Sequence, residues 1–110
     1  MLFRDIGVKD VVDGKRVKVV KADVRSYDPA ILRNCDAVVD LAAISQPDPL
    51  KLIDVKLFYE INYYAPIRTV NLAAKHGVKR YVFTFTCSVY GFHKDIVNEN
   101  SPPNPLELYA

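Results

Sequence analysis

The stretch RYVFTFTCSVYGF, residues 80–92, begins like a buried strand and ends in small polar side chains. Its first half is apolar and rich in aromatic and β-branched residues, which is typical of a strand covered on both faces. We therefore predict a strand over residues 80–86. Three hydroxyls and a thiol gather at its carboxyl end: Thr84, Thr86, Cys87 and Ser88.

The residues before this strand predict an alternation of strands and helices. Two apolar, β-branched runs indicate strands over residues 17–22 and 37–41. Between them, Asp28 followed by Pro29 predicts the N-cap and first turn of a short helix that extends to about Asn34. Such an alternation is typical of an α/β protein with a parallel sheet.

A longer helix is predicted over residues 55–76, between the second and third strands. Its apolar residues recur at helical spacing, and Gly77 provides a C-terminal stop. Pro66 falls inside this pattern, so we expect it to kink the helix. After the third strand the sequence is rich in proline up to Leu106, where we expect another helix to begin.

Composition limits the possible functions. The chain has 110 residues, of which 50% are hydrophobic and 25% charged, as in one small soluble domain. Its formal charge of +2 is spread along the sequence, so we expect neither a nucleic-acid partner nor a membrane partner. The sequence contains neither a signal-peptide pattern nor an apolar run long enough for a membrane span, which predicts a cytoplasmic protein. Its two cysteines and two histidines have no ligand-like spacing, so no metal site is predicted.

The carboxyl ends of the three predicted strands carry distinctive groups. The first strand ends at Asp23 and Val24, the second at Leu41, Ala42 and Ala43, and the third in the hydroxyl cluster. In parallel sheets ligands bind beyond these ends. Small residues there let a ligand approach the backbone, and hydroxyls can form hydrogen bonds to it. We therefore predict a ligand site along this edge.

Three motifs carry a resemblance to a known family. They are DLAA at 40–43, TCSVYG at 86–91 and NENSPPNPLELYA at 98–110. In this order and spacing they resemble the extended short-chain dehydrogenase/reductase superfamily, specifically its NAD-dependent epimerase/dehydratase branch. The resemblance runs from about Lys18 to Ala110 and implies a Rossmann-like, doubly wound parallel sheet.

Two parts of that family's pattern are missing from the sequence. No glycine-rich phosphate loop precedes Lys18, and the sequence stops before the lysine of the Tyr-xxx-Lys motif. We therefore expect residues 1–110 to be a partial NAD(P)-binding Rossmann-like domain, an internal fragment without the first two strands and the Tyr-xxx-Lys helix. In the family's strand order these two strands lie between 17–22 and 37–41. The isolated residues are expected to be inactive and prone to aggregate, or to join 17–22 directly to 37–41.

The resemblance also implies roles for individual residues. Thr86 matches the catalytic Ser/Thr and Tyr109 the catalytic tyrosine, while Asp23 and Val24 match the pair that holds adenine. The cofactor-binding residues that it implies are Asp23, Val24, Leu41, Ala42, Ala43, Asn62, Thr84 and Tyr109. Those implied to contact substrate are Thr86, Ser88 and Tyr90. Simpler interpretations stay open: Thr84 also suits an ordinary strand residue and Tyr109 an exposed one, while Asp23 also suits a loop cap and Asn62 a tie between the helix and a loop.

The resemblance implies an oxidoreductase that uses NAD or NADP on a nucleotide sugar. A sugar carbon is oxidised transiently, and epimerisation, dehydration or reduction follows. The family also implies a homodimer built through the long helix that contains Asn62 and the helix that starts near Tyr109. The alternative is a truncated or non-catalytic domain that binds a nucleotide or acts as a scaffold without turnover.

Overall fold

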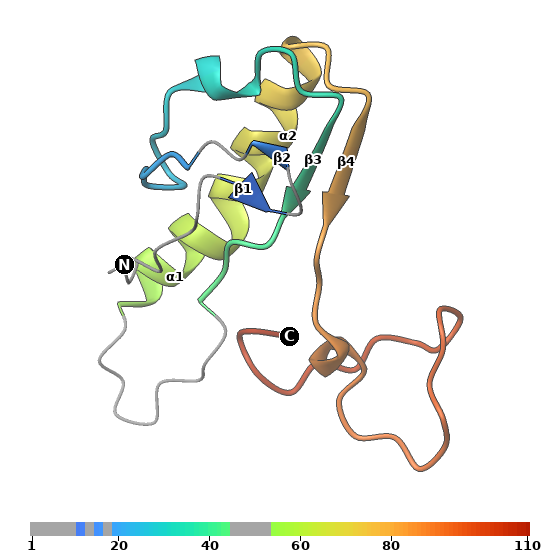
Figure 1. Cartoon of the computed structure of the whole chain (residues 1–110). Helices are drawn as coiled ribbons and strands as arrows, with labels where there is room; N and C mark the ends of the chain where they lie inside the picture. Colours follow the sequence, from blue (N-terminus) through green and yellow to red (C-terminus); the bar gives the residue numbers. More distant parts are fainter. Residues whose placement is uncertain (1–10, 13–14, 17–18, 45–53) are drawn as a thin grey trace.

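The computed structural model describes residues 11–12, 15–16, 19–44 and 54–110. In Figure 1 a pair of parallel strands lies beside one long helical segment, and an extended tail continues beyond the strands. The predicted α/β class with a parallel sheet is confirmed. Within the described residues it is a partial Rossmann-like sheet, in which one parallel pair carries a helical layer on one face.

The parallel pair consists of β3 (Ala37–Asp40) and β4 (Arg80–Phe83). Val38 lies opposite Tyr81, and Asp40 lies opposite Phe83. The strand predicted over 80–86 therefore ends early, at Phe83. One further ladder bond joins the Thr84 N–H to the Asp40 carbonyl at 3.1 Å. Beyond it, the described residues show no further pairing between this segment and the segment after β3.

The long helix forms where it was predicted, but in three parts. It begins as α1 (Val55–Tyr59), continues as the π-helical segment η2 (Glu60–Tyr64) and ends as α2 (Ala65–Lys75). Proline has no N–H, and its ring crowds the carbonyl four residues earlier. The π-helical turn directly before Pro66 widens the helix there, so the irregularity expected from proline appears as a π segment.

Local signals at both ends of the helices are confirmed. The Asp28 carboxylate accepts from the Ala30 N–H at 2.9 Å and caps the short 3-10 helix η1 (Pro29–Leu32). At the end of α2, Gly77 has φ +76, a left-handed conformation that glycine adopts without strain. The N–H groups of Gly77 and Val78 bond to carbonyls of the last helical turn, as in a Schellman motif.

The N-terminal strand prediction is wrong for most of its length. Residues 19–22 are irregular, and residues 17–18 lie outside the described residues. Strand pairing occurs earlier, between β1 (Val11–Val12) and β2 (Lys15–Arg16), which are antiparallel and are separated in the sequence by Asp-Gly, a strong hairpin signal. In the described strand order 19–22 does not pair with β3, so the expected direct joining to 37–41 is also wrong there. Without a neighbouring strand these residues have no ladder to complete.

The helix expected from Leu106 is also absent. The chain instead forms a turn, with the Ala110 N–H bonded to the Glu107 carbonyl at 3.1 Å. Leu106 and Leu108 are exposed, so an amphipathic helix here would bury no apolar face against the described residues. Short helices are marginal without such packing.

The core lies between the long helix and the loops that face it. Its buried hydrophobic residues, among those described, are Tyr27, Leu32, Ile61, Ala65 and Ala73. Four of the five come from the long helix or η1, and the side of the sheet turned away from the helix contributes none. Most of the buried apolar side chains therefore belong to the helical layer. None of these core residues lies at the carboxyl ends of β3 and β4.

Candidate functional site at the strand ends

A small pocket lies at the carboxyl ends of β3 and β4, with a volume of about 60 Å³. Segments far apart in sequence form it: the residues after each strand, one residue of η2, and the end of the tail. In Figure 1 the tail leaves β4, loops away and returns below the strand ends. The lining residues are Asp40, Leu41, Ala42, Ala43, Asn62, Phe83, Thr84, Phe85, Thr86 and Tyr109. The structure thus brings both predicted catalytic residues and most of the predicted cofactor-binding residues together.

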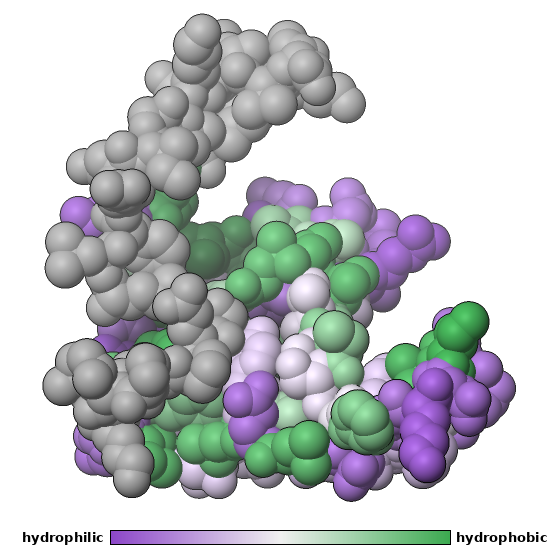
Figure 2. All heavy atoms as spheres, turned by 90° about the horizontal axis from the view of Figure 1, so that it is seen from below, coloured by the Kyte–Doolittle hydropathy of each residue, from purple (hydrophilic) through white to green (hydrophobic). Residues whose placement is uncertain are grey.

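Figure 2 views the molecule from this side. Green apolar residues alternate there with white and pale residues of intermediate hydropathy, and purple hydrophilic residues gather mainly on the side away from the grey ones. A mostly apolar site with a few polar groups is the usual character of a small-molecule site.

Thr86 is held in a defined position by the chain that follows it. Its Oγ1 accepts a hydrogen bond from the Ser88 N–H at 3.1 Å and donates one to Ser88 Oγ at 3.1 Å, so it caps the 3-10 helix η3 (Cys87–Tyr90). A hydroxyl oxygen has two lone pairs, and the Ser88 N–H uses one of them. The other is available to a hydroxyl of a ligand.

Ser88 and Tyr90 do not line this pocket. Both lie on η3, half-buried, next to the pocket residue Thr86. Ser88 acts on the site through its hydrogen bonds to Thr86, whereas nothing in the described residues links Tyr90 to the pocket directly.

Asn62 ties the helix to the loop after β3. Its Oδ1 accepts from the Ile44 N–H at 2.9 Å, and its Nδ2 donates to the Ile44 carbonyl at 3.0 Å. The simpler interpretation of Asn62, a tie between helix and loop, therefore holds in this geometry. It is compatible with a cofactor role, because the fixed loop is the one whose Ala42 and Ala43 line the pocket.

Asp23 and Val24 lie at a second pocket, of about 220 Å³, and not at the first. Leu57 and Ile61 of the long helix form the other wall of this second pocket. Ile61 precedes Asn62, so the two pockets adjoin neighbouring residues of one helical turn. The residues predicted to hold adenine and those predicted to lie near the reactive end of the cofactor are therefore in separate pockets. Both pockets are lined by residues of the long helix.

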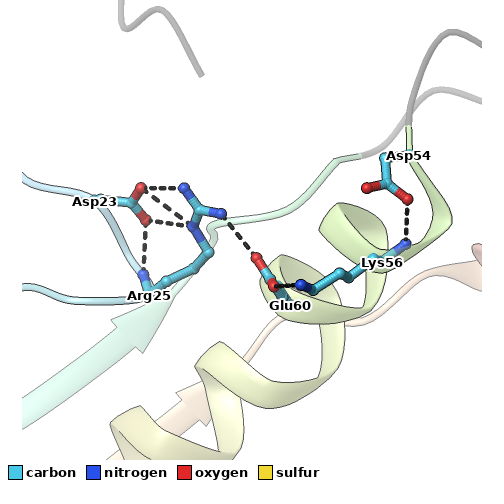
Figure 3. A network of polar contacts seen from close by, with 5 residues as sticks. All are labelled: Asp23, Arg25, Asp54, Lys56 and Glu60. Atoms are coloured by element: carbon cyan, nitrogen blue, oxygen red, sulfur yellow. Dashed lines mark hydrogen bonds and ion pairs between the residues drawn. The ribbon is translucent and has the colours of Figure 1, made fainter.

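A network of charges surrounds Asp23 (Figure 3). The Arg25 guanidinium donates to Asp23 Oδ2 at 2.6 Å and to Glu60 Oε2 at 2.8 Å. Lys56 Nζ lies 3.9 Å from the other oxygen of Glu60. Arg25 thus joins the loop after residue 22 to the long helix, a role that its position in the sequence did not reveal.

This network lowers the pKa of Asp23. The side chain of Arg25 donates to the Asp23 carboxylate and its backbone N–H adds a further bond, and together they lower the pKa from 3.8 to about 2. Asp23 is therefore an anion near neutral pH, in the form that accepts hydrogen bonds.

The sequence did not single out Asp40 and Tyr81. The Tyr81 hydroxyl donates to Asp40 Oδ2 at 2.5 Å, and Asp40 Oδ1 accepts from the Ala42 N–H at 3.2 Å. Burial, followed by the bond to Asp40, raises the pKa of Tyr81 well above its usual range, so the phenol stays protonated. The two residues are 41 positions apart, and no local signal pairs them.

With this geometry established, comparison with known proteins identifies the family. The model of the NAD dependent epimerase/dehydratase family matches residues 6–110. The chain belongs to this family. The match covers nearly the whole sequence, so the resemblance on the three motifs is confirmed.

The chain is also similar to one curated protein and to several solved structures. A curated relative from Escherichia coli O157:H7, N-acetyl-alpha-D-glucosaminyl-diphospho-ditrans,octacis-undecaprenol 4-epimerase, is 33% identical over 88 residues, which are 80% of this chain and 25% of that protein. MoeE5 in complex with UDP-glucuronic acid and NAD superposes with a TM-score of 0.80 at 25% identity, over 92% of this chain and 34% of that one. A mutant UDP-glucuronic acid 4-epimerase from Bacillus cereus, bound to a fluorinated UDP-sugar and NAD, gives a TM-score of 0.68 at 28% identity over 79% of this chain and 28% of that one.

The chain spans about a quarter to a third of the length of these relatives. Among the described residues no helix has the length and apolar character needed to cross a membrane. A search of the same residues for groups of three or more potential metal ligands finds none.

Proposed function

We propose that the protein containing this chain is an NAD-dependent epimerase that acts on a nucleotide sugar. The observation that carries the proposal is the pocket at the strand ends, where Thr86 and Tyr109 meet Ala42, Ala43 and Asn62. Hydroxyls that suit acid–base chemistry thus lie beside small residues that admit a cofactor. Membership of the epimerase/dehydratase family supports assigning that chemistry to this pocket.

The residues present fit a dinucleotide at two points. The pocket of about 60 Å³ is too small for a whole dinucleotide, but its small and polar lining suits the reactive end. The second pocket holds the ionised Asp23 carboxylate beside Val24, which suits an amino-substituted base, because the carboxylate accepts from an amine. A ligand lying across the turn at Ile61 and Asn62 would reach both pockets. NAD bound in this way would supply the hydride acceptor.

Tyr109 and Thr86 would handle the proton. The C–H bond of the sugar carbon breaks as its hydroxyl loses a proton, and we assign Tyr109 to take that proton. Only the phenolate form of Tyr109 can take a proton, and a free phenol, with a pKa of about 10, is almost entirely protonated near neutrality. A cation close to Tyr109 is therefore required in the complete protein to favour the phenolate. The Thr86 hydroxyl, which donates to Ser88 Oγ in this structure, would turn to donate to the reacting oxygen and orient it.

The substrate class rests on the relatives. The similar solved structures are complexes with UDP-sugars. The curated relative from Escherichia coli O157:H7, in contrast, is named for a sugar carried on a lipid diphosphate. Both classes attach the sugar through a diphosphate, and we commit to the nucleotide sugar because it recurs among the structural neighbours. Epimerisation at the 4-carbon is favoured over dehydration or reduction for the same reason.

We further propose that the complete protein is a cytoplasmic homodimer. Apolar and aromatic residues of the long helix are exposed, including Tyr63, Tyr64 and Ile67, so that face is available to a second copy. Both cysteines are free, which agrees with a reducing compartment. Light scattering of the complete protein would measure its oligomeric state.

The deciding experiment uses the complete natural protein. NAD and NADP binding are measured by calorimetry, and UDP-sugars deuterated at the 4-carbon are then followed by NMR. We expect NAD to bind and the label to return to the same carbon of the epimer, because the hydride is removed and replaced within one site. Turnover of a lipid diphosphate sugar only would move the substrate assignment to that class. A protein that binds neither dinucleotide would contradict the function and support the non-catalytic alternative.

A further inference from the structure

The carboxylate of Asp40 bridges two parts of the molecule at the edge of the pocket. One oxygen accepts from the Tyr81 hydroxyl at 2.5 Å, and the other accepts from the Ala42 N–H at 3.2 Å. Asp40 is the last residue of β3 and also lines the pocket. A partly buried carboxylate that accepts at both oxygens is well satisfied, so it holds its neighbours in a defined geometry.

Tyr81 anchors this bridge to the rest of the fold. It lies on β4 opposite Val38, and its hydroxyl is also 3.5 Å from the carbonyl of Pro66 on the long helix. The hydroxyl is therefore fixed between the sheet and the helix. Through Asp40, both layers set the position of Ala42.

The loop from Ala42 to Ile44 is consequently fixed at both ends. Asp40 holds its first N–H, and Asn62 holds both backbone groups of Ile44. Ala42 and Ala43, within this loop, supply small side chains to the pocket wall. A close approach between a ligand and a backbone tolerates little displacement, because a shift of about 1 Å can cost on the order of 100-fold in rate.

We propose that Asp40 and Tyr81 form a positioning pair that sets the backbone at Ala42 and Ala43 against the cofactor. The inference rests on the proposed function, because it assumes that NAD occupies this pocket. It assigns a positioning role to two residues that we expect to touch neither the substrate nor the reacting atoms. Their action is indirect, through the one N–H of Ala42.

If Asp40 and Tyr81 act as a pair, their effects on NAD affinity should not add up in a double-mutant cycle. In the complete protein, Asp40→Ala should weaken NAD binding by about tenfold, and Tyr81→Phe by a smaller factor, because Asp40 then still holds Ala42. The double variant should bind NAD no more weakly than Asp40→Ala alone, since residues that act as a unit are not additive. The KM for the sugar should change little in all three variants.

Asp40→Asn distinguishes positioning from negative charge. Its carboxamide oxygen can accept from the Ala42 N–H, and its amide can donate to the phenol oxygen. We therefore expect Asp40→Asn to recover most of the NAD affinity that Asp40→Ala loses. Gly77→Ala is the control for a loss of stability alone, because Gly77 lies at the far end of α2 and contacts no pocket residue. It should lower the melting temperature and leave NAD affinity unchanged.

The outcomes separate this inference from the function on which it rests. Wild-type protein that fails to bind NAD overturns both. Wild-type protein that binds NAD, together with unchanged affinity in Tyr81→Phe and Asp40→Ala, leaves the function standing and overturns the positioning pair. Independent, additive losses overturn it as well. If Asp40→Ala does not fold, Tyr81→Phe decides, because undiminished NAD affinity in that variant contradicts the inference and reduced affinity supports it.

Discussion

The Asp23 carboxylate is bound by one guanidinium through both of its oxygens. Arg25 Nε lies 3.0 Å from Oδ1 and Nη2 lies 2.6 Å from Oδ2, and the Arg25 backbone N–H adds a bond of 2.9 Å. Planar, two-pronged pairing of this kind is specific to arginine. An anion that is fixed in this way keeps one orientation at the wall of the second pocket, which Asp23 lines.

We predict that Asp23 titrates near pH 2 and that Arg25 is the cause. Because its pKa of about 2 lies below the ordinary 3.8, the pair contributes to stability above about pH 4, and the contribution is lost as the pH falls toward 2. Arg25→Ala should raise the pKa of Asp23 toward 3.8. Arg25→Lys should give an intermediate pKa, because lysine keeps the positive charge but lacks the two-pronged guanidinium. Carboxyl NMR titration measures all three. An unchanged pKa in Arg25→Ala would contradict the assignment.

The two proposed catalytic hydroxyls belong to Thr86 and Tyr109, which both line the pocket at the strand ends. In the complete protein, Thr86→Val and Tyr109→Phe should each lower kcat by at least about tenfold and leave NAD affinity nearly unchanged, because both act on the proton rather than on the cofactor. Thr86 also caps η3, so Thr86→Ser is the matched control that keeps both the cap and the hydroxyl. Undiminished turnover in both variants, measured on the true substrate, would remove these residues from the mechanism.

At the level of elements, the segment after β4 is folded back on itself at Gly91. Gly91 has φ +60, and a Cβ at this position would collide with the carbonyl oxygen of Asn104. The Asn104 N–H bonds to the Val89 carbonyl at 2.8 Å. This contact holds the returning tail, which carries Tyr109 to the pocket.

We predict that Gly91→Ala and Gly77→Ala differ in their effect on activity. Both glycines have positive φ, so each substitution costs about 1 to 2 kcal/mol of backbone strain. Gly77 has open space around its Cβ position, whereas at Gly91 the Asn104 segment must move. Gly91→Ala should therefore lower kcat strongly and Gly77→Ala should not, when kinetics and thermal melting are measured together. Equal activity at equal stability would show that the Asn104 contact does not position Tyr109.

Over the whole molecule, the described residues cover the parallel pair of strands on one face only. Val39 and Val82 are paired across β3 and β4, and both are exposed, at 60% and 51%. They alternate with Val38 and Tyr81, which are half-buried. The face away from the long helix is therefore apolar and uncovered within the described residues. Uncovered apolar strands with free edges promote association.

We predict that residues 1–110, expressed alone, self-associate and do not bind NAD saturably at micromolar concentration. The pair Val39→Thr and Val82→Thr should reduce association, because threonine keeps the β-branched shape and removes apolar surface. Val55→Thr, an equally exposed site at 59% on α1, is the control. Light scattering and calorimetry measure both properties. A monodisperse monomer that binds NAD would contradict the prediction and show that this part of the fold suffices.

Signals that act within a few residues were predicted correctly from the sequence. The Asp28 cap and the Gly77 stop depend on residues next to the backbone groups involved. The strand β3 begins at Ala37 as predicted but ends at Asp40, one residue before the predicted end. The strand expected over 17–22 failed for the opposite reason. Its residues have strand propensity, but a strand forms only beside a partner, and residues 19–22 have none among those described.

The sequence by itself determined the family, the α/β class and the residue types at each strand end, because motifs and periodicity are local properties of the chain. Only the tertiary structure decided which of those residues meet. It placed Thr86 and Tyr109 in one pocket, assigned Asp23 to another, and joined Asp40 to Tyr81 across two strands. These pairings depend on strand register and on the return of the tail, and such long-range contacts leave no pattern in a single sequence.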